Sequence, residues 1–159
     1  MPEVLFRVDD RLIHGQVVEA WVPYLKADEI VVVSDEIASD ELRRTIMRFS
    51  TPEGVELRIL TVPESFAYLS GGSALRNTLV LLPGLKEAVE LITRGLPMRS
   101  LNIGGMHYSA GKNFSIGKAI FLSDEDRLHL RSISAAGVQL EGRGVPTDRP
   151  IDLVEAIAR

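Results

Sequence analysis

One short apolar segment constrains most strongly what this chain can fold into. Residues 30–33 read Ile-Val-Val-Val, without a single polar interruption. An unbroken run of this length, made of β-branched residues, is typical of a strand covered on both faces. Such strands belong to parallel sheets with helices on either side. The run is also far too short to cross a bilayer.

Strand-like and helix-like segments alternate along the rest of the chain. Strands are expected at residues 4–8, 30–33, 55–61, 78–82, 100–103 and 138–140. Helices are expected at residues 16–26, 39–50, 62–69, 85–94, 124–136 and 151–158, and turns at 70–73 and 146–150. The pattern Thr61-Val-Pro-Glu64 predicts a capping box that opens the helix at 62–69. The β-α-β order predicts an α/β, three-layer sandwich with a mainly parallel central sheet and helices on both faces, as a single domain over residues 1–159. In the helix expected at 39–50, Leu42, Ile46 and Phe49 recur at helical spacing. Trp21 and Phe49 are expected in the core.

Composition excludes several classes of function. The 159 residues contain no cysteine, so disulfides, zinc-thiolate sites and thiol nucleophiles are ruled out. A net charge of −4 argues against nucleic acid as the main partner. The three histidines are scattered without metal-binding spacing. No signal-peptide pattern follows Met1, so a cytoplasmic location is expected.

The segment RVDDRLIHGQV, residues 7–17, places a histidine between a strand and a helix. If the helix begins near Gly15, its free N–H groups and its dipole favour an anion beside His14. The same positive end keeps the imidazole neutral, and a neutral imidazole can accept a phosphoryl group. Arg11 can neutralise the incoming charge, and Gly15 allows close backbone approach.

Two questions about this loop stay open at the level of sequence. Asp9 or Asp10 could orient the histidine ring by accepting its other N–H, or could instead pair with Arg7 or Arg11. A lone histidine in such a loop is also often only a surface or capping residue.

A glycine-rich loop at residues 104–111 invites comparison with a nucleotide-binding P-loop. That interpretation fails, because Met106 and Asn113 stand where a glycine and a Ser or Thr are required. Two interpretations remain: a structural turn, or a loop beside His14 in which Lys112, Ser109 or backbone N–H groups touch phosphate. His107 is expected to be a solvated loop residue.

The segment DDRLIHGQV resembles the active-site loop of the IIB component of the mannose/fructose/sorbose family of the phosphoenolpyruvate-dependent sugar phosphotransferase system. Three further segments resemble the same family in the same order: residues 30–36, residues 102–106 with Gly111-Lys112, and residues 136–141 through 147–148. The stretch Gly142-Arg-Gly144 departs from the family pattern, because many relatives are more basic there.

The resemblance implies that His14 accepts a phosphoryl group on Nδ1 from a phosphohistidine of the IIA component and passes it to a sugar entering through IIC and IID. Arg11 and Asp10 match the loop arginine and acid. Further phosphate contacts are predicted from Arg7, Gly15, Gln16, Lys112 and Ser109. No nucleotide, metal or other cofactor is expected, and contact with the membrane is expected only through partners. The alternatives are a regulatory protein that senses phosphorylation and, less favoured, a small-molecule α/β enzyme.

Overall fold

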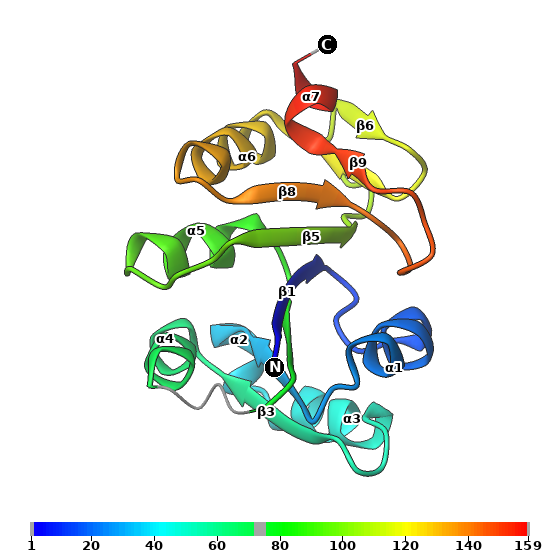
Figure 1. Ribbon diagram of the computed structural model, residues 1–159, viewed down its shortest axis with the longest axis vertical. Coiled ribbons are helices and arrows are strands. Elements are labelled where there is room, and N and C mark those ends of the chain that lie inside the picture. The colour runs from blue at the N-terminus through cyan, green and yellow to red at the C-terminus, as the bar shows by residue number, and fades with distance from the viewer. Residues whose placement is uncertain (1, 72–75, 159) are drawn as a thin grey trace.

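Strand β2 (Glu29–Val33) is buried along its whole length in the computed structural model, which describes residues 2–71 and 76–158 (Figure 1). Ile30 and Val32 pack into the hydrophobic cluster on one face of the sheet. Val31 and Val33 pack into the cluster on the opposite face. The apolar run therefore predicted this strand correctly, because side chains that alternate between two covered faces must all be apolar.

Seven strands form the central sheet in the spatial order β3-β2-β4-β1-β5-β8-β9. Besides β2, they are β1 (Val4–Asp9), β3 (Glu56–Leu60), β4 (Thr78–Leu82), β5 (Ser100–Gly105), β8 (Gln139–Gly142) and β9 (Ile151–Asp152). All neighbouring pairs are parallel except β8 and β9, which are antiparallel. Six strands therefore run in the same direction, and their carboxyl ends lie on the same side of the molecule.

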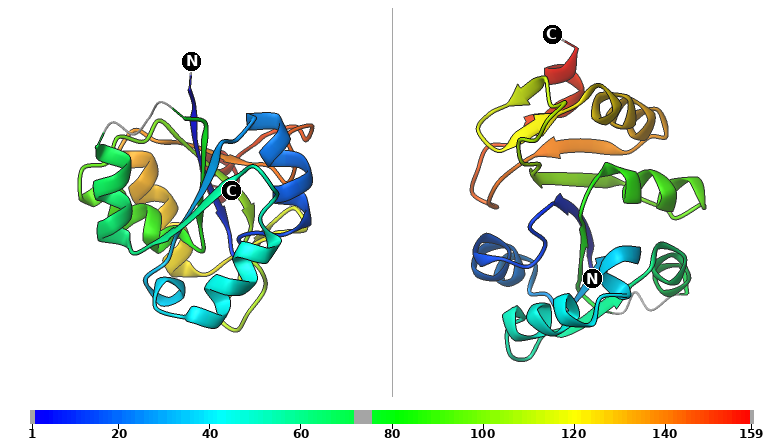
Figure 2. Two further views of the ribbon diagram at one scale, coloured as in Figure 1. Left: turned by 90° about the horizontal axis from the view of Figure 1, so that it is seen from below. Right: turned by 180° about the vertical axis from the view of Figure 1, so that it is seen from behind.

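Helices cover both faces of this sheet. The first begins as a π-helical turn, η1 (Val17–Trp21), and continues as α1 (Val22–Leu25). The others are α2 (Asp35–Ala38), α3 (Glu41–Ser50), α4 (Val62–Ser70), α5 (Leu85–Thr93), α6 (Asp124–Ala135) and α7 (Leu153–Ile157). Helices α1 and α3 lie on one side, and α4, α5 and α6 on the other (Figures 1 and 2). The expected three-layer sandwich is confirmed.

Two helix starts are fixed by reciprocal hydrogen bonds. The capping box predicted at Thr61 and Glu64 opens α4, and a second one joins Ser123 to Asp126 at the start of α6. In each box the hydroxyl accepts a bond from the third helical N–H, and the acid accepts one from the N-cap residue. Within the described ranges, no helix is both long and apolar enough to cross a bilayer.

The chain departs from the expected elements in several places. A two-stranded antiparallel sheet, β6 (Phe114–Ile116) with β7 (Ile120–Leu122), follows the glycine-rich loop and was not predicted. The helix expected at residues 39–50 begins at Glu41, because the Asp40 side chain caps it, and residues 35–38 form a separate short helix that was not predicted. The closing helix begins only at Leu153, since Ile151 and Asp152 pair with β8 and the Asp152 carboxylate caps α7. Residues 72–73 of the turn expected at 70–73 lie outside the described residues, and Ser70 is the last residue of α4.

The prediction that Phe49 belongs to the core is wrong, whereas Trp21 is buried as expected. Helix α3 turns Met47 toward the sheet, and Leu42, Ile46 and Phe49 toward solvent. Helical spacing shows that these three side chains share a face, but only the packing of the helix decides which way that face points.

Candidate functional site

The loop after β1 places His14 at the carboxyl ends of the parallel strands. Leu12 adopts a left-handed conformation with φ of 59°, which turns the chain sharply while its side chain stays buried. This conformation costs an L-residue roughly 1–2 kcal/mol, which burial of the leucine offsets. Helical backbone then begins at Gly15, and the His14 carbonyl accepts a hydrogen bond of 2.9 Å from Val18 N. His14 therefore stands at the N-terminal end of the first helix, as predicted.

Asp9, the last residue of β1, is fully buried and holds this loop together. Its Oδ2 lies 2.9 Å from Nε2 of His14 and accepts a bond of 3.3 Å from Arg7 Nη2. Its Oδ1 accepts bonds from the backbone N and the Nε of Arg11, at 3.1 and 3.4 Å. An ionised carboxylate can only accept hydrogen bonds, so His14 Nε2 carries the proton. In the neutral form of the imidazole, Nδ1 is then the unprotonated nitrogen.

The two aspartates that sequence could not tell apart have different partners. Asp10 does not contact His14. Its carboxylate accepts a bond of 2.7 Å from the backbone N of His107 and pairs with the Nδ1 of that residue. His107 remains largely exposed, as expected of a loop residue, but it is tied to the loop rather than free. Asp9 is thus the acid that orients the His14 ring.

Arg7 lies inside the protein beneath the site. Its Nη1 donates to Asn102 Oδ1 and, over 2.8 Å, to the Arg143 carbonyl, while Nη2 donates to Asp9 and the Gly144 carbonyl. The guanidinium also stacks over the Trp21 ring at 4.7 Å. Burial lowers the pKa of Arg7, and Asp9 acts in the opposite direction; arginine remains charged at any physiological pH. This placement differs from the phosphate contact expected of Arg7, because the residue reaches His14 only through Asp9.

Gly104 leaves the space that Arg7 fills. A Cβ built on Gly104 would lie 1.8 Å from Arg7 Nη2 and 2.1 Å from its Cζ. On the neighbouring Gly105, a Cβ would stand 3.2 Å from Asp9 Oδ1. The first two residues of the expected glycine-rich loop are therefore the end of β5, where they pack against the two residues that support His14.

We expect Gly104→Ala to destabilise the protein by about 3–5 kcal/mol, because the methyl group must displace a buried, paired guanidinium. Thermal or urea unfolding measures this loss. Gly105→Ala is the matched comparison and should cost clearly less, since its Cβ has room at a contact only slightly shorter than usual. Equal stabilities of Gly104→Ala and the wild type would contradict this account of how Arg7 is seated.

Arg11 is the cation that remains accessible beside His14. Its side chain is 41% exposed, against 15% for that of His14. Its Nη2 donates to Gln16 Oε1 at 3.1 Å, which orients the guanidinium. Within the part of the chain that the structure describes, its Nη1 has no protein partner. Gly15 offers open space, because a Cβ there would meet nothing within 4 Å.

The other two side chains predicted to contact phosphate make no hydrogen bond or ion pair with His14 among the described residues. Lys112 Nζ is 2.6 Å from Asp126 Oδ2, where it joins the capping box of α6. Ser109 is exposed, and its carbonyl accepts a bond from Lys112 N. Burial alone would raise the pKa of Asp126, but the hydrogen bonds from Lys112 and Ser123 outweigh it and lower that pKa.

We therefore expect Lys112→Gln to cost about 1–2 kcal/mol of stability through the loss of a charged hydrogen bond, while phosphoryl transfer continues at the wild-type rate. Because the pKa of Asp126 is lowered on folding, this stabilisation is fully present above the pKa of an unfolded aspartate and fades as pH falls through the folded value. Urea unfolding of both proteins at neutral and acidic pH measures the difference. Slower transfer would instead support the phosphate contact.

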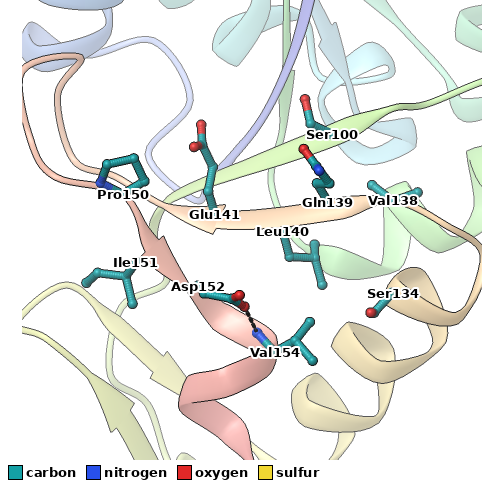
Figure 3. Close-up of a pocket in the computed structure, with 10 residues that line it drawn as sticks. All are labelled: Ser100, Ser134, Val138, Gln139, Leu140, Glu141, Pro150, Ile151, Asp152 and Val154. Atoms are coloured by element: carbon teal, nitrogen blue, oxygen red, sulfur yellow. Dashed lines mark hydrogen bonds between the residues drawn. The ribbon is translucent and has the colours of Figure 1, made fainter.

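Two hollows on the surface relate differently to this loop. One, of about 530 Å³, lies along β8, β9 and α6, and none of the predicted site residues lines it (Figure 3). The other, of about 430 Å³, adjoins the site through Gln16 and Gly104. Lys118, Arg143 and Arg149 also line the second hollow. The positive charge of these three side chains makes the second hollow suitable for a phosphorylated or acidic partner.

Sequence reasoning missed the residues that support the site from distant segments. Asn102 accepts from Arg7 and donates to Glu141 Oε1 at 3.1 Å. Trp21 donates to the Gly144 carbonyl at 2.9 Å. A polar residue inside an apolar strand, such as Asn102 in β5, was the only available signal, and it does not reveal its partner.

In this α/β protein, a buried aspartate holds a histidine at the start of a helix. The histidine lies at the carboxyl ends of the parallel strands, and this arrangement suits a protein that accepts an anionic group. The family of sorbose-subfamily IIB components of the sugar phosphotransferase system matches residues 3–159. A sorbose-specific IIB component of Lacticaseibacillus casei is 38% identical over 96% of this chain and 93% of its own length. A mannose-specific IIAB component of Escherichia coli is 31% identical over 98% of this chain and 48% of its own.

Solved structures agree with these sequence relatives. The IIB domain of the sorbose permease from Klebsiella pneumoniae has a TM-score of 0.91 at 30% identity, covering 99% of this chain and 97% of that one. The chain therefore belongs to the sorbose-subfamily IIB components of the sugar phosphotransferase system. Proteins of this family are phosphotransferase components that transfer a phosphoryl group to a sugar.

Proposed function

We propose that Nδ1 of His14 carries the phosphoryl group. The observation that supports this most directly is the 2.9 Å contact between His14 Nε2 and the buried carboxylate of Asp9. That contact fixes the proton on Nε2 and leaves the lone pair of Nδ1 available as a nucleophile. The first turn of the helix adds a positive electrostatic potential that attracts the phosphoryl oxygens.

Each nearby side chain has a distinct part in the proposed transfer. Nδ1 of His14 attacks the phosphorus of a donor phosphohistidine, forming a new P–N bond as the donor's P–N bond breaks. The donor ring, which carries a proton on its other nitrogen, leaves as neutral imidazole with the electron pair of the broken bond. Asp9 offsets the positive charge that develops on the His14 ring, and Arg11, held by Gln16, neutralises the phosphoryl oxygens. Positioning and charge neutralisation supply most of the catalysis, as is usual for phosphoryl transfer.

The proposed partners follow from the family. The donor is a IIA component, and the acceptors are the IIC and IID membrane components with their incoming sugar. The relative named IIAB joins the two functions in one polypeptide, which supports a IIA donor. We place this chain, as one domain, in the cytoplasm, where it meets these partners in turn. Relatives named for sorbose and for mannose share this fold, so the sugar is not assigned from this chain.

The direct test is to phosphorylate the protein through a phosphoenolpyruvate-driven relay ending in a IIA donor. Intact mass at alkaline and acidic pH should reveal one acid-labile phosphate, and peptide mapping should locate it on His14. Nitrogen NMR of the labelled ring should place it on Nδ1. The label should leave when membranes containing IIC and IID are supplied together with the transported sugar. A label that forms but never moves onward would favour the regulatory alternative.

A further inference from the structure

Helix α3 turns its apolar side away from the protein. Leu42, Ile46 and Phe49 are 70%, 55% and 87% exposed. At 100° per residue they lie within roughly 60° of one another around the helix axis. Met47, on the opposite side, packs against the core. No residue of α3 is fully buried, so the most apolar face of the helix is the one that it presents to solvent.

The charges of α3 surround this apolar stripe (Leu42, Ile46 and Phe49). The helix carries three arginines against one glutamate, a net charge of +2 in a chain whose net charge is −4. Around the helix axis, Arg43 lies roughly 60° beyond Ile46 on one side of the stripe, and Glu41 and Arg48 lie roughly 80° and 100° beyond Phe49 on the other. Arg43 makes only an exposed pair with Glu36, and Arg48 has no partner among residues 2–71 and 76–158. An apolar stripe on a helix of net positive charge, with long arginine side chains that can reach past it, is the pattern of a helix that lies in the interface of an anionic membrane.

We propose that α3 rests on an anionic lipid surface, with the stripe inserted among the acyl chains and Arg43 and Arg48 at the headgroups. The inference rests on the proposed function, in which the phosphoryl acceptor is membrane-bound. Contact with the membrane would raise the concentration of the carrier near that acceptor without adding a protein contact.

A second copy of this chain fits the stripe less well. Pairing two identical α3 faces would bring Arg43 and Arg48 close to the same residues of the other copy. Three side chains also supply only part of the roughly 800 Å² that each partner buries in a standard interface. Anionic lipid, in contrast, matches both the apolar and the charged parts of the helix.

The position of α3 leaves the His14 loop accessible. In the sheet, β3, which follows α3, is separated from β1 by β2 and β4. Three strand spacings correspond to roughly 14 Å. Figure 1 shows α3 at the end of the molecule opposite β8 and β9. A membrane beneath α3 therefore does not need to cover the loop between β1 and η1.

The test is flotation of the purified protein with vesicles of phosphatidylcholine, with and without phosphatidylglycerol. We expect binding only to the anionic vesicles, weakened by salt. The triple variant Leu42→Ser/Ile46→Ser/Phe49→Ser should bind at least about tenfold more weakly. Leu128→Ser is the matched control, because Leu128 is 62% exposed on α6, and it should bind like the wild type. Circular dichroism verifies that each variant is folded.

A second measurement reports insertion directly. Phe49→Trp places an indole at the stripe, whereas the native Trp21 is buried. Its emission should shift to shorter wavelength on anionic vesicles, and Leu128→Trp should not respond. No binding of the wild type, or a dimer in sedimentation that the triple variant abolishes, would overturn the proposal. The triple variant should still accept phosphate from a soluble donor, so failure at His14 and failure at α3 are separate results.

Discussion

Replacing His14 with glutamine is expected to abolish acid-labile labelling by a phosphorylated IIA donor. Glutamine can still donate a hydrogen bond to Asp9, so the loop should keep its shape. An amide nitrogen has no nucleophilic lone pair, because that pair is delocalised into the carbonyl. Loss of label therefore reports loss of the nucleophile rather than loss of the fold. Intact mass spectrometry at alkaline pH, with circular dichroism of the same sample, provides the measurement.

His107→Gln is the matched control for this variant. His107 pairs with Asp10 and is mostly exposed. No buried carboxylate fixes its tautomer, and it does not stand at the N-terminus of a helix. We expect this variant to be labelled at the wild-type rate. A label that survived in His14→Gln and disappeared in His107→Gln would move the carrier to His107.

The second large effect is expected from Asp9→Asn. The substituted amide can turn its NH₂ toward His14, which favours the tautomer with the proton on Nδ1 and removes the nucleophile. The positive charge that develops on the ring also loses its counter-ion. We expect the rate of phosphoryl transfer to fall by about 10²–10⁴-fold, in the range of general acid–base and ring-orienting effects. Rapid-quench labelling from a phosphorylated donor measures the rate.

Asp9→Asn should also destabilise the protein, by about 3 kcal/mol, because Arg7 stays buried without its carboxylate. Labelling must therefore be measured well below the unfolding temperature of the variant. Asp10→Asn makes the same chemical change one residue further along the chain, beside an exposed histidine. It should leave both stability and transfer rate nearly unchanged. Equal effects of the two variants would contradict the assignment of Asp9 as the orienting acid.

Local signals in the chain were sufficient for much of the framework. The Ile-Val-Val-Val run identified β2, and the Thr61–Glu64 pair identified the start of α4. The predicted helix start at Gly15 placed His14 at a helix N-terminus. These predictions succeeded because hydrogen bonds and burial within a few residues decide each of them. The strands β6 and β9 were missed because each is only two or three residues long and depends on its partner strand.

Contacts between distant segments decided the rest of the site. From the sequence, Arg7 was predicted to contact phosphate. In the structure its guanidinium is enclosed by Gly104, Asn102 and the carbonyl of Gly144. Lys112 was also predicted to contact phosphate, but in the structure its ammonium group is paired with Asp126 of α6. Such partners lie up to 137 residues away along the chain, and spacing carries no information about them.

The sequence alone determined the parallel α/β framework, the loop that carries His14 and Arg11, and the apolar stripe of α3. Only the tertiary structure decided that Asp9 rather than Asp10 holds the histidine, and that the stripe faces outward. The physical reason is the same in both cases. Residue spacing fixes which side chains share a face, whereas the packing of helices and strands fixes what that face meets.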